Sequence, residues 1–172
     1  MNKPTSHYPA YFQKYLDLVP SDQTIFSALH DQHMDTIDLI TSLDDATLQS
    51  AYAPGKWTIM EVIGHIMDTE RILCHRAFTI ARGDQSVLPS FSQDLYVSNS
   101  RMQNRKILGV VKEFSLIRAN TIEMFSQFDE QMTQQIGNSN GHEIIVSAIA
   151  YMICGHEIHH RSVIEKLYIG AL

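Results

Sequence analysis

Apolar residues recur every three to four positions along four long stretches of the chain, which is the period of an amphipathic helix. The connections between them are rich in proline, glycine, asparagine and aspartate, and no set of segments alternates with the period of two typical of strands. The sequence therefore predicts an all-α fold, a four-helix bundle preceded by a short lead-in segment over residues 1–20. The expected helices are one capped by Ser21 or Asp22 and ending before Ser42, one from Ile59 to Arg82, one from about Arg101 to Phe128, and one beginning near Val146.

The second predicted helix has the clearest boundaries. Thr58-Ile-Met-Glu61 forms a capping box, in which the hydroxyl and the carboxylate bond to the free amides of the first turn. Gly83 follows the helix as a left-handed stop. Beyond it, residues 84–100 are predicted to be the longest irregular stretch, a loop that could close over a pocket. The cluster Gly137-Asn-Ser-Asn-Gly141 is predicted to be a turn.

The composition is that of an ordinary globular protein, because 44% of the 172 residues are hydrophobic and 19% are charged. We expect a single domain over residues 1–172. The net charge of −6 and the lack of a basic stripe argue against a nucleic-acid partner. The first 20 residues hold no continuous apolar run, so neither a signal peptide nor a membrane span is expected. Two isolated cysteines, Cys74 and Cys154, fit a reduced, cytoplasmic setting.

The last predicted helix carries the densest chemistry of the chain. At the helical period its apolar stripe includes His156 and His160, one turn apart, while Glu157 lies away from the stripe and is expected to be wetter. Two imidazoles at this spacing can bind one metal ion. In a chain with nine histidines, however, such a pair is weak evidence by itself. Metal binding and two ordinary core histidines therefore stay equally open from this pair alone.

The pair also spells the H-E-x-x-H pattern of zinc proteases, His156-Glu-Ile-His-His160. That class needs a third ligand downstream, and no histidine follows His160 in the sequence. The sequence also lacks the strands with which a protease aligns its substrate. A protease is therefore not favoured, and any third ligand must come from upstream.

Among the upstream histidines, only His65 combines an inward-facing position with a location on a different helix from the pair. It lies three residues after Val62, in the second turn of its helix. The other histidines are predicted to lie elsewhere: His30 and His33 at the edge or in the core of the first helix, His75 nearly three turns beyond His65, His142 in a turn, and His159 at the rim of a pocket.

Two segments of the chain carry a resemblance to a known family. Trp57-Thr-Ile-Met-Glu-Val-Ile-Gly-His65, followed by Glu70-Arg71, Arg76-Ala77 and Ala81-Arg82-Gly83-Asp84, resembles the second-helix motif of the DinB/YfiT-like superfamily. Asn140-Gly141 and the stretch from Tyr151 through Gly155 to His160 resemble its closing motif. The resemblance covers essentially the whole chain in order. One departure is Ile145, where a capping Ser or Thr is expected before the last helix.

The resemblance implies a four-helix bundle in which three histidines, here His65, His156 and His160, bind a divalent metal. Members with a function use a low-molecular-weight thiol for transfer or isomerisation, others are described as hydrolases, and many are dimers. Three nitrogen ligands suit zinc, nickel, copper or ferrous iron, and the sequence does not choose among them. We expect zinc or nickel first, with iron or manganese as further candidates. The resemblance also implies a small-molecule substrate, a thiol co-substrate and a homodimer.

The chemistry of the residues agrees with that implication. Three neutral imidazoles leave a coordination position open, which is typical of a catalytic site. We expect a metal-dependent thiol S-transferase. The alternatives are a hydrolase that uses metal-bound hydroxide and a non-catalytic bundle that binds a metal or small molecule.

Three charged residues near His65 are further candidates. Asp68, one turn beyond His65, is predicted to be a catalytic base or an acceptor behind a ligand, with an ordinary surface acid equally open. Arg71 and Arg76 could steer an anionic substrate, although solvated charges on a helix face are the more common case.

Overall fold

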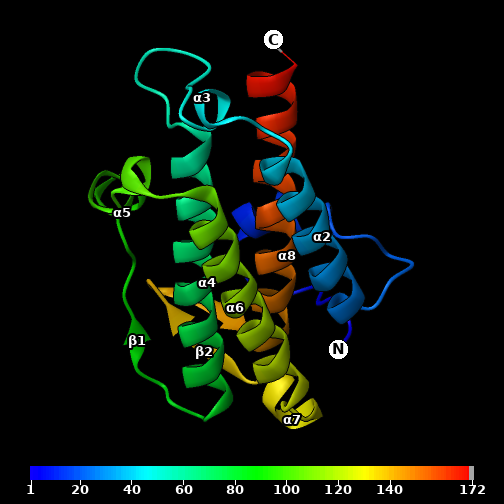
Figure 1. The fold of residues 1–172 in the computed structure, drawn as a ribbon. Coiled ribbons are helices and arrows are strands. Elements are labelled where there is room, and N and C mark those ends of the chain that lie inside the picture. Colours follow the sequence, from blue (N-terminus) through cyan, green and yellow to red (C-terminus); the bar gives the residue numbers. More distant parts are fainter. Residues whose placement is uncertain (171–172) are drawn as a thin grey trace.

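The computed structural model describes residues 1–170. Four long helices run side by side: α2 (Ile25–Thr41), α4 (Ile59–Ala81), α6 (Ile107–Ser126) and α8 (Val146–Val163) (Figure 1). The helix α4 packs against α8 and α6, and α2 packs against the same two helices. This arrangement confirms the predicted all-α class and the four-helix bundle.

The ends of α4 follow the sequence prediction closely, and those of two other helices do not. The capping box of Thr58 and Glu61 is present, and Gly83 has the left-handed φ of +79°. The helix α2 begins later than predicted, because Thr24 and not Ser21 or Asp22 accepts the amide of Ser27. The helix α6 also begins later than the predicted Arg101, which has a left-handed φ of +54°.

Shorter helical segments fill the connections and the two ends of the described chain. They are η1 (Ala10–Phe12), α1 (Gln13–Leu16), α3 (Asp45–Leu48), α5 (Gln93–Asn99), η2 (Met102–Asn104), α7 (Glu130–Thr133) and η3 (Ile164–Ile169), the last a π-helical continuation of α8. The stretch 84–100 is thus not irregular as predicted, because α5 and a short strand lie within it.

A small sheet at one end of the bundle corrects the prediction that the chain has no strands. It consists of β1 (Val87–Leu88), β2 (Ile136–Ser139) and β3 (His142–Ile145), in that order, with β1 parallel and β3 antiparallel to β2 (Figure 1). Strands of two to four residues are too short to show an alternating pattern. His142 therefore lies in β3 and not in a turn.

The hairpin explains the departure at Ile145. Asn140 and Gly141 have φ values of +54° and +81°, the combination that a two-residue hairpin turn needs. The strand β3 passes directly into α8, with Ile145 at the N-cap and no side-chain cap. The amide of Val146 instead donates to the carbonyl of Gln135. A backbone bond from the sheet region thus satisfies one amide of the first turn, at a helix start that has no capping side chain.

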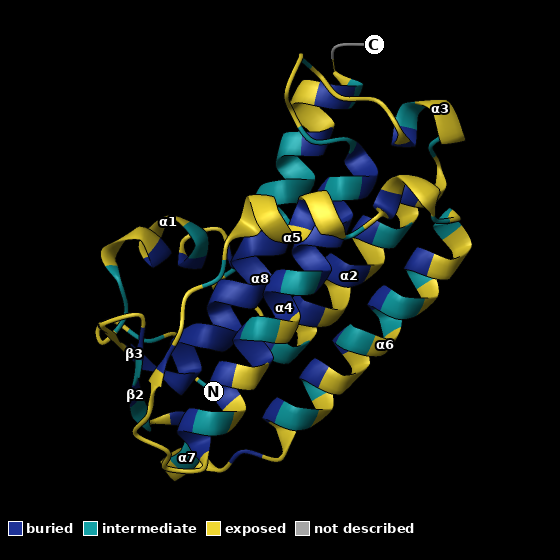
Figure 2. Ribbon diagram, turned by 90° about the vertical axis from the view of Figure 1, so that its left-hand side faces the viewer, coloured by how far each residue is buried: buried dark blue, intermediate teal, exposed yellow. Residues whose placement is uncertain are grey.

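The helix α8 is buried far more completely than its amphipathic pattern predicts. Every residue from Val146 to Glu157 is buried, whereas α6 keeps an exposed outer face (Figure 2). The prediction that Glu157 is wetter is wrong, because its side chain is fully buried where α2 packs on α8. None of the described helices is long and apolar enough to cross a membrane.

The N-terminal segment packs against α8 at a bare patch of backbone. A Cβ atom at Gly155 would overlap the backbone carbonyl of Tyr15, so only glycine allows this approach. The segment thereby brings Tyr15 beside the histidines of α8.

Candidate metal centre

The structure brings His65 of α4 together with His156 and His160 of α8. The Nε2 atom of His156 lies 3.1 Å from Nε2 of His65 and 3.1 Å from Nε2 of His160. One ring nitrogen from each of the three residues lies within 4.8 Å of the other two. The helices α4 and α8 pack against each other, which explains why side chains facing this seam meet.

Burial keeps the three imidazoles neutral. His65 and His156 are 3% and 4% exposed, and His160 is half-buried. Burial lowers the pKa of His65 to about 4 and that of His160 to about 3. Burial, together with the neighbouring histidines, also lowers the pKa of His156 well below its usual value. At neutral pH each ring therefore has one nitrogen with a free lone pair.

The donor set fits a single divalent cation. Two nitrogens bound to one zinc ion at about 2.0–2.1 Å lie roughly 3 Å apart, close to the separations of the Nε2 atoms here. Without a cation, three converging Nε2 atoms cannot all be paired by N–H groups of the same three rings. The hydroxyl of Thr69 is the nearest partner on the other side of His65, with Oγ1 3.5 Å from Nδ1. When Nδ1–H donates to this hydroxyl, the tautomer leaves Nε2 free for a cation.

Aromatic rings surround the cluster. The indole of Trp57 lies 5.0 Å from the ring of His65, between centroids, and the ring of Tyr15 lies 5.7 Å from that of His156. His159 contacts both Tyr15 and His160, in the rim position predicted for it. The rings of Trp57, Tyr15 and His159 thus pack directly beside the three histidines.

Two cavities meet at the cluster. One of about 250 Å³ is lined by all three histidines and by residues of the N-terminal segment, α4 and α5. The other, of about 370 Å³, is lined by His160 and, on the far side, by His159, Trp57 and Asp94. A larger hollow of about 700 Å³ between α4 and α6 holds none of the three histidines. We call the cavity of about 250 Å³, which all three histidines line, the histidine cavity.

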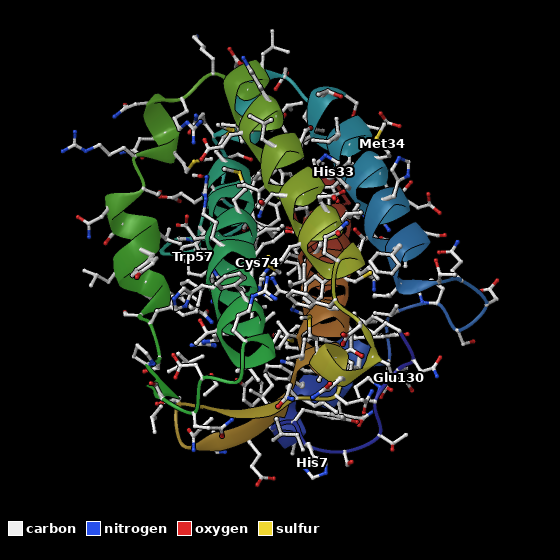
Figure 3. All side chains as sticks on the ribbon, turned by 90° about the horizontal axis from the view of Figure 1, so that it is seen from below. His7, His33, Met34, Trp57, Cys74 and Glu130 are labelled. Carbon is white, nitrogen blue, oxygen red and sulfur yellow. The ribbon has the colours of Figure 1, made fainter. Side chains whose placement is uncertain are left out.

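The remaining predicted non-ligands lie away from the cluster. His33 is buried between α2 and α6, with Nε2 3.1 Å from the hydroxyl of Ser115 (Figure 3). His30 and His75 are exposed, and His142 is exposed in β3.

Asp68 is half-buried and lies 3.5 Å from a guanidinium nitrogen of Arg71. Burial raises its pKa, and Arg71 opposes that rise. Asp68 does not line the histidine cavity. Its role as a base or an acceptor therefore stays a prediction. Arg71 also pairs with Glu113 on α6, which makes it a surface ion-pair residue.

A buried charged network beside the cluster has no counterpart in the sequence prediction. Arg118 of α6 donates to both oxygens of Glu70, to Glu157 at 2.7 Å, and to the carbonyl of Leu29. Thr121 donates to Glu70 as well. The glutamate of the H-E-x-x-H pattern is thus held in an ion pair and does not face the histidines as a protease base would. Hydrophobic spacing alone could not reveal this, because charged residues at inward positions look like breaks in the stripe.

The histidine cavity also contains Arg76, which the sequence placed more readily on a solvated face. It is 8% exposed, and its Nη2 donates to the carbonyl of Pro89 at 2.7 Å. The two cysteines are buried as expected, and burial raises the pKa of each thiol to about 12, so neither is a reactive thiolate.

The fold and the cluster define a class: four-helix bundles with a candidate three-histidine metal centre between two helices. The chain belongs to the DinB superfamily, whose model matches residues 28–164. Among curated proteins it is 23% identical, over 72% of this chain and 71% of the other, to "Putative metal-dependent hydrolase OB0413" of Oceanobacillus iheyensis.

Solved structures share the fold at low sequence identity. YfiT from Bacillus subtilis, described as a "probable metal-dependent hydrolase with an unusual four-helix bundle topology", is 13% identical with a TM-score of 0.72, covering 99% of this chain and 93% of YfiT. The mycothiol-dependent maleylpyruvate isomerase is 12% identical with a TM-score of 0.65. That match covers 81% of this chain and 60% of the isomerase, so this chain corresponds to only part of that enzyme.

Proposed function

We propose that this chain is a divalent-metal-dependent enzyme that transfers a low-molecular-weight thiol to an electrophilic small molecule. His65, His156 and His160 would hold the ion, with zinc or nickel first and iron or manganese as further candidates. The observation that carries the proposal is the convergence of three neutral imidazoles from two helices on the wall of a cavity of about 250 Å³.

The chemistry follows from the donor set. A divalent ion with three protein ligands supplies an open position in which a thiol or a water loses its proton at neutral pH. The protein's own residues do the rest. Burial keeps the imidazole lone pairs available, and the rings of Trp57 and Tyr15 pack beside those of His65 and His156.

The polar lining of the histidine cavity favours a thiol as the nucleophile. Among the described residues that line it, the polar groups are those of Tyr11, Tyr15, Thr69, Gln93 and Arg76 besides the histidines, and none is a carboxylate. A thiol held at an ion bound by the three histidines would already have lost its proton, so thiol transfer would need no separate base. The thiol-dependent isomerase of the same fold supports this choice.

A hydrolase is the second candidate, and one residue favours it. Asp94 of α5 lines the neighbouring cavity together with His160, and its charge acts on the pKa of His65. A carboxylate so placed could orient or deprotonate a water. The names of the Oceanobacillus and Bacillus proteins support this alternative.

Elemental analysis tests the site itself. Protein purified without added metal is expected to hold close to one equivalent of a divalent ion, and His65→Ala is expected to lose it. His33→Ala is the matched control, because it truncates a buried histidine outside the cluster. Metal retained in His65→Ala would remove that residue from the site.

A screen of electrophiles with several thiols then separates the functions. Thiol transfer is expected to depend on the thiol and to change less than about threefold in Asp94→Asn, since no base is required. Hydrolysis is expected without any thiol and to fall about 10²-fold or more in that variant. Full metal loading with no turnover of either kind would favour a non-catalytic binding bundle.

A further inference from the structure

Arg76 is a buried cation without a carboxylate partner. It is 8% exposed, and its one recorded hydrogen bond goes to a neutral acceptor, the carbonyl of Pro89. Within residues 1–170 no carboxylate forms an ion pair with it. Burial lowers the pKa of Arg76, which shows that its charge is held at a cost.

Two other arginines of the bundle, unlike Arg76, have carboxylate partners. Arg118 is 2% exposed and pairs with the carboxylates of Glu70 and Glu157. Arg71, five residues before Arg76 on α4, pairs with Asp68 and Glu113. Arg76 lines the histidine cavity instead, so a ligand in that cavity can supply the counter-ion that residues 1–170 do not provide.

The guanidinium is prepared for such a partner. The carbonyl of Pro89 takes one of the five N–H groups of the guanidinium, and no other residue among 1–170 accepts a hydrogen bond from the remaining four. A planar guanidinium with free N–H groups on one edge matches the two oxygens of a carboxylate. The side chains of Tyr11 and Gln93 line the same cavity and can add hydrogen bonds.

The position of Arg76 relative to the histidines sets the shape of the ligand. Arg76 follows His65 by 11 residues on α4, which is three turns along the same face and about 16 Å along the helix axis. The long arginine side chain spans part of that distance. A ligand that reaches both ends must therefore be elongated, with its two functional groups separated by a short chain.

We propose that Arg76 binds the carboxylate of an organic acid whose reacting group lies at the three histidines. The reacting end of this assignment rests on the proposed function, whereas the carboxylate end rests on Arg76 alone. The cavity would thus select small acids over neutral analogues of the same length.

The carboxylate end is tested on metal-free protein. Butyrate and 1-butanol are titrated into wild type, Arg76→Gln, Arg76→Lys and Arg71→Gln, and binding is followed by NMR, including the Arg76 Nε–H signal. Butyrate is expected to bind wild type and Arg71→Gln equally and Arg76→Gln at least about tenfold more weakly, since charge-assisted bonds are lost. Arg76→Lys, which keeps the charge but not the fork, is expected to be intermediate.

The variants are chosen to keep the fold. The amide of Arg76→Gln can still donate to the carbonyl of Pro89, and circular dichroism checks the helices of each variant. If Arg76→Gln does not fold, the comparison of wild type with Arg76→Lys decides. Equal binding of butyrate and 1-butanol to wild type, or undiminished butyrate binding when Arg76 is replaced, would overturn the proposal.

The two ends are joined in a second titration on zinc-loaded protein. 4-Mercaptobutyrate is expected to bind at least about tenfold more tightly than 4-mercapto-1-butanol, and Arg76→Gln to reduce that preference to under about threefold. Butyrate binding that depends on Arg76 in a protein that takes up none of zinc, nickel, iron and manganese would refute the proposed function and leave the carboxylate site standing. Tight zinc binding with no preference for 4-mercaptobutyrate over 4-mercapto-1-butanol would refute the carboxylate site and leave the proposed function standing.

Discussion

His156 and Glu157 are neighbours on α8 and both are buried. They nevertheless belong to two polar clusters that differ in how far hydrogen-bond donors and acceptors are paired. Glu157 joins a network in which the guanidinium of Arg118 donates to two carboxylates and to a backbone carbonyl. Burial opposes the charge of Arg118, but Glu157 and Glu70 raise its pKa above the ordinary value. Most donors and acceptors in this network face each other within the chain; among its side chains in residues 1–170, Oε1 of Glu157 alone has no hydrogen-bond partner.

The histidine cluster lacks that internal balance. His65, His156 and His160 direct nitrogens at one another, and no carboxylate or hydroxyl of residues 1–170 is hydrogen-bonded to any of the three Nε2 atoms. One polar group therefore holds the helices together, and the other is complete only with something from outside. The comparison teaches that burial of polar residues does not by itself mark a functional site, whereas an unmatched set of lone pairs does.

The largest expected effect comes from breaking the network. Arg118→Met would leave two buried carboxylates unpaired and is expected to lower the free energy of unfolding by about 3–5 kcal/mol. Urea denaturation of the metal-free protein measures the change. Arg71→Met, at an exposed ion pair, is the control and should cost less than about 1 kcal/mol. Equal losses in the two variants would show that the network is not structural.

Metal removal should lower stability through the histidine cluster and not through the Arg118 network. If the cluster binds an ion, a thousandfold excess of metal over its dissociation constant is expected to stabilise the protein by about 4 kcal/mol, and a chelator should reverse this. His156→Gln should unfold at the same temperature with metal and with chelator. His33→Gln, outside the cluster, should keep the difference. Thermal scans in the two buffers give the comparison, and a metal-dependent shift that survives in His156→Gln would place the ion elsewhere.

Acid should separate folding from metal affinity. Folded His65 and His160 have pKa values of about 4 and about 3, below the ordinary 6.5. Between these values the unfolded chain binds more protons than the folded one, so the free energy of unfolding should fall as pH falls through this window. The affinity of the folded protein for zinc should change little from pH 7 to about pH 5, because the rings are already neutral.

Calorimetric zinc titrations at pH 5.5, 6.2 and 7 check the last expectation. Three histidines with ordinary pKa values would lose about a thousandfold in affinity at pH 5.5, since each would compete with a proton. A loss of that size would contradict neutral, buried imidazoles.

Much of the fold was open to sequence analysis, for a physical reason. Long helices show a regular spacing of apolar residues in the sequence, and the capping box at Thr58 predicted the first residue of α4 correctly. The short sheet left no such record, because two to four residues cannot display alternation. The hydrogen bond from the amide of Val146 to the carbonyl of Gln135 was equally hidden. Residues distant in sequence from a helix end do not appear in the local pattern of that end.

The site divides in the same way. The convergence of His65 with the α8 pair could be predicted because each occupies an inward position on a long helix. The burial of Arg76 and Glu157 could not, because a charged residue at such a position looks like solvent-facing sequence until its partner or cavity is known. Asp94 was missed because α5 was not foreseen in the stretch that contains it.

The bare backbone at Gly155 has a consequence for the width of the histidine cavity. Gly155 lines no part of that cavity, yet it sets how near the carbonyl of Tyr15 can come to α8. One added methyl group would push this carbonyl outward, and the phenol rings of Tyr11 and Tyr15 would move with it. A homologous chain with a side chain at the position of Gly155 would need its N-terminal segment to pack further from α8. Its cavity would therefore admit ligands of a different width, even with the same three histidines.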